Sequence, residues 1–201
     1  MSSSNEFYTF SFANGTVTGM TETDGRKSKT SFIGNSDFSV KTNAAGAVTE
    51  VTRTELSRKG YAETTVYSDA DGDGRFTESL ELEVATATVR SLEKMRFTFG
   101  ANGDVVGAQE QTIGRNGAVV WKNERIDANE GYSRATIDGD TYLVKTETER
   151  NSVEFTLYRD DNQDGIWTEI AEGEVNGNSA INVVALVGLS GGLSAAETLV
   201  G

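Results

Sequence analysis

The 201-residue sequence contains no cysteine, no histidine and no proline. Without cysteine there is neither a disulfide framework nor thiolate chemistry, so an extracellular chain of this kind needs another means of stapling its loops. Without histidine, the Ser-His-Asp and Cys-His catalytic arrangements and the usual zinc and iron ligand sets are excluded. Any metal that this chain binds should therefore be a hard cation held by oxygen atoms.

Basic residues and long apolar runs are also scarce. The chain has 18 Lys and Arg against 31 Asp and Glu, a net charge of −13, so we expect cations as partners and neither nucleic acid nor anionic membranes. The most apolar stretch, residues 181–196, is broken by Asn182, Ser190 and Gly191-Gly192 and is too short for a membrane span. Residues 1–12 lack the features of a signal peptide. The sequence predicts a cytoplasmic protein or, preferably, one exported without an N-terminal signal.

What the sequence does contain is alternation of polar with apolar or β-branched residues, interrupted by Asn-Gly and Asp-Gly pairs. Such a pair between two alternating runs is the strongest short-range signal of a β-hairpin, because both turn positions need positive φ. We therefore expect an all-β fold, an antiparallel hairpin meander arranged as a barrel or a sandwich. The five pairs are Asn14-Gly15, Asp24-Gly25, Asn102-Gly103, Asn116-Gly117 and Asp138-Gly139.

The two halves of the sequence resemble each other. Residues 10–19 can be laid on residues 97–107, and from Asn14 onward the matched positions are 88 apart. Residues 67–78 match residues 158–169 at a spacing of 91, a difference that a longer turn in the second half would absorb. We infer an internal duplication, with a first β repeat over 1–90, a second over 91–175 and a low-charge tail over 176–201.

Each repeat contains an acidic loop with the spacing of a calcium site. Asp69, Asp71 and Asp73 are followed by Gly74, and Asp160, Asn162 and Asp164 are followed by Gly165. Alternate side chains on a tight turn converge on one point, and calcium takes 6 to 8 oxygens in flexible geometry. Arg75 and Ile166, at the seventh position, would contribute only a backbone carbonyl, and Phe76 and Trp167 would anchor the loops to the core. We expect two bound calcium ions, with the tighter one in the first loop.

These loops resemble the calcium loops of EF-hands and dockerins, over about a dozen residues in each half. The bidentate glutamate that ends an EF-hand loop is replaced by Leu80 and Ala171. Glu78 and Glu169 are the predicted closing carboxylates, with Glu81 and Glu172 as the alternatives. Because the flanking residues 63–67 and 152–158 have strand patterns, we predict a loop at a hairpin tip rather than a helix-loop-helix sensor.

The tail, residues 176–201, has a different composition from the rest of the chain. Glu197 is its one charged residue, and small and apolar residues dominate. It resembles the uncleaved C-terminal signals of type I secretion substrates, among which the RTX proteins are best known, although their glycine-rich nonapeptide repeats are absent here. The alternative is a last strand and a short helix, residues 193–199, that close the fold.

The sequence as a whole predicts a secreted bacterial calcium-binding β protein without enzymatic activity, whose calcium is structural. A matrix, adhesion or surface-layer role follows, with extracellular polysaccharide or a cell-surface matrix as partner. One alternative is a binding module in which calcium braces a site for a carbohydrate or small ligand. Another is a secreted enzyme that acts on polysaccharide through a carboxylate pair such as Asp127 and Glu130.

Overall fold

The computed structural model describes residues 6–31, 33–34, 36–57, 59–86, 89, 92–137 and 139–177. Within these ranges the chain forms fourteen β-strands and no helix, so the predicted all-β fold is confirmed. No helix in these ranges is therefore long and apolar enough to cross a membrane. The predicted tail falls almost entirely on residues 178–201, which lie outside the described residues.

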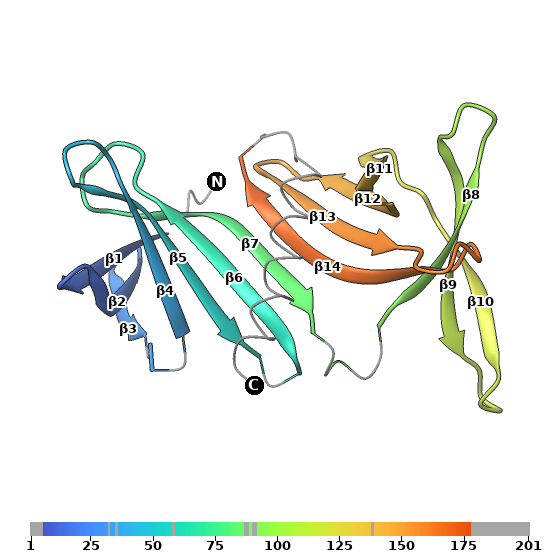
Figure 1. Cartoon of the computed structure of the whole chain (residues 1–201), viewed down its shortest axis with the longest axis horizontal. Coiled ribbons are helices and arrows are strands. Elements are labelled where there is room, and N and C mark those ends of the chain that lie inside the picture. The colour runs from blue at the N-terminus through green and yellow to red at the C-terminus, as the bar shows by residue number, and fades with distance from the viewer. Residues whose placement is uncertain are drawn as a thin grey trace. The chain divides into compact units, whose positions relative to one another are not determined.

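The strands follow one another as a meander (Figure 1). Every strand pairing with a described register is antiparallel. The strands of the first half are β1 (Glu6–Ala13), β2 (Thr16–Asp24), β3 (Lys27–Ser31), β4 (Ser36–Thr42), β5 (Val48–Leu56), β6 (Tyr61–Ser68) and β7 (Thr77–Ala85). Those of the second half are β8 (Lys94–Phe99), β9 (Val105–Ile113), β10 (Val119–Glu124), β11 (Glu130–Ile137), β12 (Asp140–Thr148), β13 (Ser152–Arg159) and β14 (Trp167–Asn176).

The chain divides into two compact units, Met1–Glu83 and Val84–Gly201. The division falls within β7, so unit 1 contains β1 to β6 and most of β7, and unit 2 contains β8 to β14. All five predicted hairpin turns lie between consecutive strands. At these turns Gly15, Gly25, Gly103, Gly117 and Gly139 all have positive φ, which is the conformation that selects glycine.

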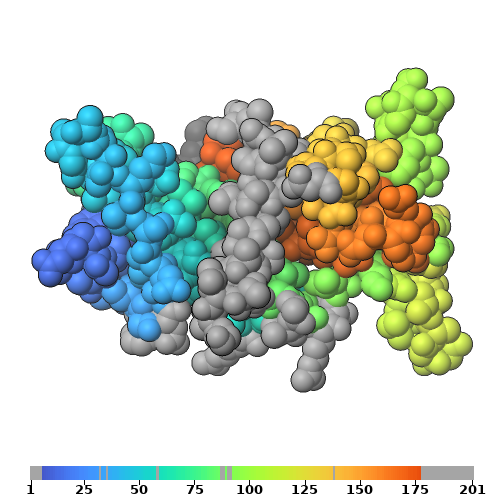
Figure 2. All heavy atoms as spheres, in the orientation of Figure 1, coloured from blue at the N-terminus to red at the C-terminus, as the bar shows by residue number. Residues whose placement is uncertain are grey.

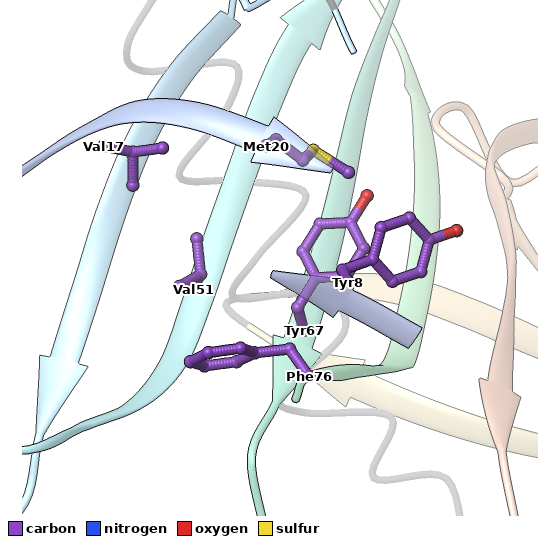
Figure 3. Close-up of a cluster of buried hydrophobic side chains, with 6 residues drawn as sticks. All are labelled: Tyr8, Val17, Met20, Val51, Tyr67 and Phe76. Carbon is purple, nitrogen blue, oxygen red and sulfur yellow. The ribbon is translucent and has the colours of Figure 1, made fainter. Parts of the chain in front are cut away.

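Unit 1 contains a three-stranded sheet, in the order β1-β2-β3, and four strands of a second, larger sheet, in the order β4-β5-β6-β7. The two sheets are joined by the backbones of Tyr8 in β1 and Phe76, which precedes β7: each amide donates to the other's carbonyl, at 2.8 and 2.9 Å. The buried core lies between the sheets and takes side chains from both (Figure 3), namely Tyr8, Val17, Met20, Val51, Tyr67 and Phe76.

Unit 2 repeats this plan. Strands β8-β9-β10 form one ribbon and β11-β12-β13-β14 form a sheet in that order. A short pairing of Trp167 with Met95 joins ribbon and sheet, at the position of the Tyr8–Phe76 bridge in unit 1. The outer ends of the ribbon, green and yellow in Figure 2, stand clear of the orange strands of the same unit. The core contains Met95, Ala108, Leu143, Tyr158 and Trp167.

Strand register and ring packing repeat between the two units at several positions. A β-bulge separates Ser11 from Phe12 in β1, and the same bulge separates Thr98 from Phe99 in β8. The ring pairs also recur: Phe10 lies 5.3 Å from Tyr67 in unit 1, and Phe97 lies 5.3 Å from Tyr158 in unit 2. The two repeats therefore share this bulge and this ring pair.

Neither unit forms a closed ring of strands among the described pairings. Among the described strands no pairing joins the two ends of either strand order, so the sheets are not closed into a barrel. In unit 1 the two sheets face each other across one core, which matches the sandwich alternative. This layering matters for the acidic loops, because each loop leads directly into the residue that joins the two layers.

Candidate metal centre

The first acidic loop connects β6 to β7 and is folded by its own carboxylates. Asp69 is 6% exposed. Its Oδ1 accepts hydrogen bonds from the amides of Gly72 (2.8 Å) and Asp73 (3.2 Å), and its Oδ2 accepts one from Gly74 (3.0 Å). Further along, Asp73 Oδ1 accepts from the amide of Arg75 at 2.8 Å. These bonds turn the loop back on itself, so that its alternate side chains face one region.

The carboxylates of Asp69, Asp71 and Asp73 converge in this loop. Each offers an oxygen, and the three oxygens lie within 4.8 Å of one another. Like charges at this separation repel, and a hard cation among them would turn the repulsion into attraction. Asp71 and Asp73 are exposed, so an ion can enter from solvent. The predicted cluster of three aspartates that can hold a metal ion is therefore present.

The second acidic loop connects β13 to β14 and repeats the same hydrogen bonds. Asp160 accepts from the amides of Asp164 (3.2 Å) and Gly165 (3.1 Å), as Asp69 does from Asp73 and Gly74. The amide of Asp164 also donates to Asn162 at 3.3 Å, as the amide of Asp73 donates to Asp71. The amide of Ile166 donates to Asp164 at 2.8 Å, as the amide of Arg75 donates to Asp73.

The second loop differs from the first in charge. Its middle side chain is Asn162, whose amide nitrogen donates to Asp164 at 3.0 Å, so the loop contributes two carboxylates and one amide oxygen. Amide oxygens are calcium ligands but carry no net charge. The hydrogen-bonded geometry is thus repeated in both units, with one loop carboxylate fewer in unit 2.

Backbone conformation is also repeated between the loops. The fourth and sixth loop positions are left-handed in both: Gly72 and Gly74 have φ of 76° and 84°, and Gln163 and Gly165 have φ of 57° and 79°. The glycines were expected, because a calcium loop turns sharply at its sixth position. Gln163 was not, since a non-glycine residue at positive φ is uncommon and has no sequence signal of its own.

The seventh position carries a side chain with a role of its own in unit 1. The Arg75 guanidinium lies 4.8 Å from the centre of the Phe7 ring, and its Nε is 3.8 Å from Asp73. Next to this contact is an open hollow of about 450 Å³, lined by Glu6, Phe7, Ser68, Ala70, Asp71, Asp73, Arg75 and Thr77. Arg75 supplies a positive charge beside the carboxylates. Ile166, at the equivalent position in unit 2, has no such charge.

The predicted closing carboxylates, Glu78 and Glu169, are not members of the three-aspartate cluster. Burial, and to a smaller extent the charge of Glu78, raise the pKa of Tyr67. Glu169 pairs in register with Tyr158, whose pKa is raised by burial, by Glu93 and then by Glu169. Both glutamates therefore lie within electrostatic range of a buried tyrosine. The alternatives Glu81 and Glu172 are exposed on their strands.

The sequence did not reveal which residues pair with the aromatic residue that follows each loop. Phe76 and Trp167, directly after the loops, are 3% and 4% exposed, as the anchor prediction required. Their backbone partners, Tyr8 and Met95, are about 70 residues away in the chain, and no local pattern connects them. The alignment of the repeats could have predicted one of these two backbone pairings only after the other pairing was known.

Comparisons of the chain with protein-family models, with curated proteins and with solved structures found no match. The two loops and the cores that they adjoin are therefore the basis for inferring a function.

Proposed function

We propose that this protein binds two calcium ions, one in each acidic loop, and that the ions stabilise the fold rather than take part in a reaction. The observation that carries the proposal is the repetition of one loop geometry in both units. Four backbone-to-side-chain hydrogen bonds recur at the same positions, although several side chains differ. The hydrogen bonds that the two loops share are those that orient the side-chain oxygen atoms.

Calcium fits these loops better than other common cations. The ligand atoms are oxygens on a flexible turn, which suits the 6 to 8 ligands and irregular geometry of calcium. Magnesium requires a stricter octahedron and gives up its water molecules reluctantly. Zinc and other borderline metals favour nitrogen and sulfur, and the chain has neither histidine nor cysteine.

A structural role follows from the position of the loops in the chain. The loop from Asp69 to Arg75 ends immediately before Phe76, whose backbone hydrogen bonds join the two sheets of unit 1. An ordered loop therefore fixes one side of that joint. Trp167 follows the second loop in the same way and pairs with Met95. Calcium would take the place of disulfides, which this chain cannot form.

We also propose, from composition and charge, that the protein works outside a bacterial cell as a matrix, adhesion or surface-layer component. An acidic, cysteine-free chain that gains stability from calcium is suited to an environment rich in that ion. Retention of the purified protein on extracellular polysaccharide or on cell envelopes, measured with and without calcium, tests this role separately from metal binding. If the protein instead hydrolyses polysaccharide, the enzymatic alternative is favoured over a matrix, adhesion or surface-layer role.

Calorimetric titration of the full chain with calcium tests the metal proposal. We expect two ions per chain, with Asp71→Ala removing one and Asp164→Ala removing the other. Asp104→Ala is the matched control, because it removes the same charge from a turn outside both loops. Because a ligand bound by the native state alone stabilises by RT ln(1 + [L]/Kd), the free energy of unfolding should rise by roughly 2.7 kcal/mol per site at a hundredfold excess.

Two results would contradict the metal proposal. One is a melting curve that is the same in millimolar calcium and in chelator. The other is equal loss of binding in Asp104→Ala and Asp71→Ala, which would indicate diffuse attraction by the net negative charge. Magnesium at the same concentration should raise the melting temperature less than calcium.

A further inference from the structure

Unit 2 contains a cavity that is separate from both acidic loops. It has a volume of about 410 Å³ and lies between the ribbon β8–β10 and the strands β11–β13. This volume falls in the range of small-molecule sites. Its wall is formed by Glu93, Met95, Ala108, Glu110, Glu124, Arg125, Asp127, Glu130, Tyr132, Lys145 and Tyr158.

The wall of the cavity is mostly polar, and a small part of it is apolar and aromatic. Met95 and Ala108 are buried core residues that reach the cavity from β8 and β9. Tyr132 and Tyr158 contribute rings, which pack against the ring of Phe97 at 5.9 and 5.3 Å. The hydroxyl of Tyr132 donates to Glu130 at 3.0 Å and that of Tyr158 to Glu93 at 3.3 Å. The tyrosines are thereby held in place.

The rest of the wall carries excess negative charge. Five of the lining residues are acids and two are bases, and both bases are already paired. Arg125 lies 2.8 Å from Asp127, and Lys145 lies 2.8 Å from Glu130. Within the described part of the chain, Glu93, Glu110 and Glu124 have no basic partner in an ion pair. Burial and the charge of Glu110 raise the pKa of Glu93, so the carboxylates are close enough to interact unfavourably.

The same positions in unit 1 carry bulkier side chains. Register places Tyr8 where unit 2 has Met95, and Met20 where it has Ala108. Tyr8 and Met20 are buried among the core side chains of unit 1 (Figure 3). The Tyr8 hydroxyl also donates to Glu6 at 2.7 Å, whereas Met95 has no donor to offer Glu93. Unit 2 therefore combines smaller side chains at these two positions with a carboxylate, Glu93, whose hydrogen bond comes from Tyr158 instead.

Two further differences between the repeats add charge to the cavity. Glu124 pairs with Ala108 as Ser31 pairs with Met20, and Glu130 pairs with Glu147 as Ser36 pairs with Glu55. Serines of unit 1 are thus glutamates in unit 2. Since unit 1 forms the same fold without these glutamates, the fold does not require them. The changes combine to give an open, acidic and partly apolar cavity.

We propose that this cavity binds a primary alkylammonium group, as carried by a diamine or by a lysine side chain. The small apolar part of the wall contacts the methylene chain, and the three glutamates that lack an ion-pair partner accept hydrogen bonds from the ammonium group. The tyrosine rings add cation–π attraction at a distance below about 6 Å. A bare divalent ion would leave Met95 and Ala108 without a partner. An anionic ligand would be repelled.

The test is a calorimetric titration of the full chain, in saturating calcium, with two probes. One is 1,5-diaminopentane and the other is Nα-acetyl-lysine methylamide with a free ε-ammonium group. Both should bind with a Kd in the millimolar range or tighter, and preference for one probe shows whether a free diamine or a lysine side chain fits better. The same lysine derivative acetylated at Nε carries no charge and should not bind.

Two variants in the cavity wall locate the site, and the first copies a residue of unit 1. Ala108→Met restores the bulk of Met20 and should weaken binding at least tenfold. Glu110→Gln removes one charge, without changing the shape of the side chain, and should weaken binding several-fold. Glu22→Gln is its matched control, because Glu22 occupies the position of Glu110 in unit 1. It should leave binding unchanged.

Three results would overturn the proposal. The first is the absence of heat with both probes at millimolar concentration. The second is wild-type affinity in folded Glu110→Gln or Ala108→Met. The third is an equal loss of affinity in Glu22→Gln and Glu110→Gln, which would mean that the ammonium group responds to the net charge of the protein. Asp71→Ala and Asp164→Ala should bind both probes normally, so failure of the calcium proposal would leave this one intact.

Discussion

At the residue scale, the two acidic loops differ at a left-handed backbone position. Gly72 and Gln163 both have positive φ, at 76° and 57°. A left-handed conformation costs a residue with a Cβ roughly 1 to 2 kcal/mol, and glycine avoids this cost. A Cβ added at Gly72 would meet no atom within 4 Å, so backbone conformation alone decides the effect of a substitution there.

We therefore predict effects of opposite sign at these two positions. Gly72→Gln should lower the free energy of unfolding by about 1 kcal/mol. Gln163→Gly should leave the free energy of unfolding unchanged or raise it by roughly a few tenths of a kcal/mol, because relief of backbone strain offsets the greater entropy of glycine in the unfolded chain. Urea denaturation in saturating calcium measures both. Destabilisation by Gln163→Gly as large as that by Gly72→Gln would show that side-chain contacts, rather than φ, control this position.

The acidic residues of the loops could be predicted from sequence because their spacing is local. Asp69, Asp71 and Asp73 lie on one turn, and their convergence follows from the turn itself. The surroundings of Glu169 could not be predicted, because a bulge between Leu157 and Tyr158 decides which residues it faces across the strands. A shift of one residue moves a side chain to the other face of a sheet, and sequence patterns rarely locate bulges.

At the element scale, the link between loop and sheet is the aromatic residue that follows each loop. Phe76 is 3% exposed and packs edge-on against Phe10, with ring centres 5.1 Å apart. Its backbone also completes the joint with β1. Side-chain packing and the joint between the sheets therefore depend on the same residue, and the loop is attached to both.

Phe76→Ala should lower the free energy of unfolding by about 3 to 5 kcal/mol, the usual range for removal of a buried phenylalanine. It should also weaken calcium binding at the first loop and leave the second loop unchanged, because the anchor of the first loop alone is lost. Phe12→Ala is the control: Phe12 is 39% exposed, and its loss should cost about 1 kcal/mol or less. Unchanged calcium affinity in a folded Phe76→Ala chain would mean that the loop is ordered independently of its anchor.

Strands and hairpins could be predicted from sequence better than the contacts between sheets. The Asn-Gly and Asp-Gly pairs located five turns, because the requirement for positive φ is a property of the turn residues themselves. The cavity in unit 2 could not be found this way. Ala108 in place of Met20 is an unremarkable difference until strand register shows that both face the same core position.

At the scale of the whole molecule, each unit has its own cluster of buried core residues within the described part of the chain. Val51 belongs to the core cluster of unit 1 and Leu143 to that of unit 2. We predict that Asp71→Ala removes the calcium-induced change in the methyl NMR signals of Val51 while that of Leu143 persists, and that Asp164→Ala does the reverse. Simultaneous loss of both changes in either variant would show that one ion controls both cores.

The last prediction concerns residues 178–201, whose role is inferred from composition alone. If these residues are a secretion signal, their removal should not disturb the cores. Deleting residues 179–201 should then leave a soluble chain whose melting temperature still rises with calcium but which stays inside its host cell. The full-length Asp104→Ala chain, expressed in the same host, should be released normally.

If Val183 and Leu186 instead fill a core, the deletion should cost about 2 to 5 kcal/mol for each large aliphatic side chain removed, and the shortened chain should aggregate with or without calcium. An insoluble product would therefore assign the tail to the fold and end the export proposal, whereas a soluble, retained and calcium-stabilised product would separate folding from export within one chain.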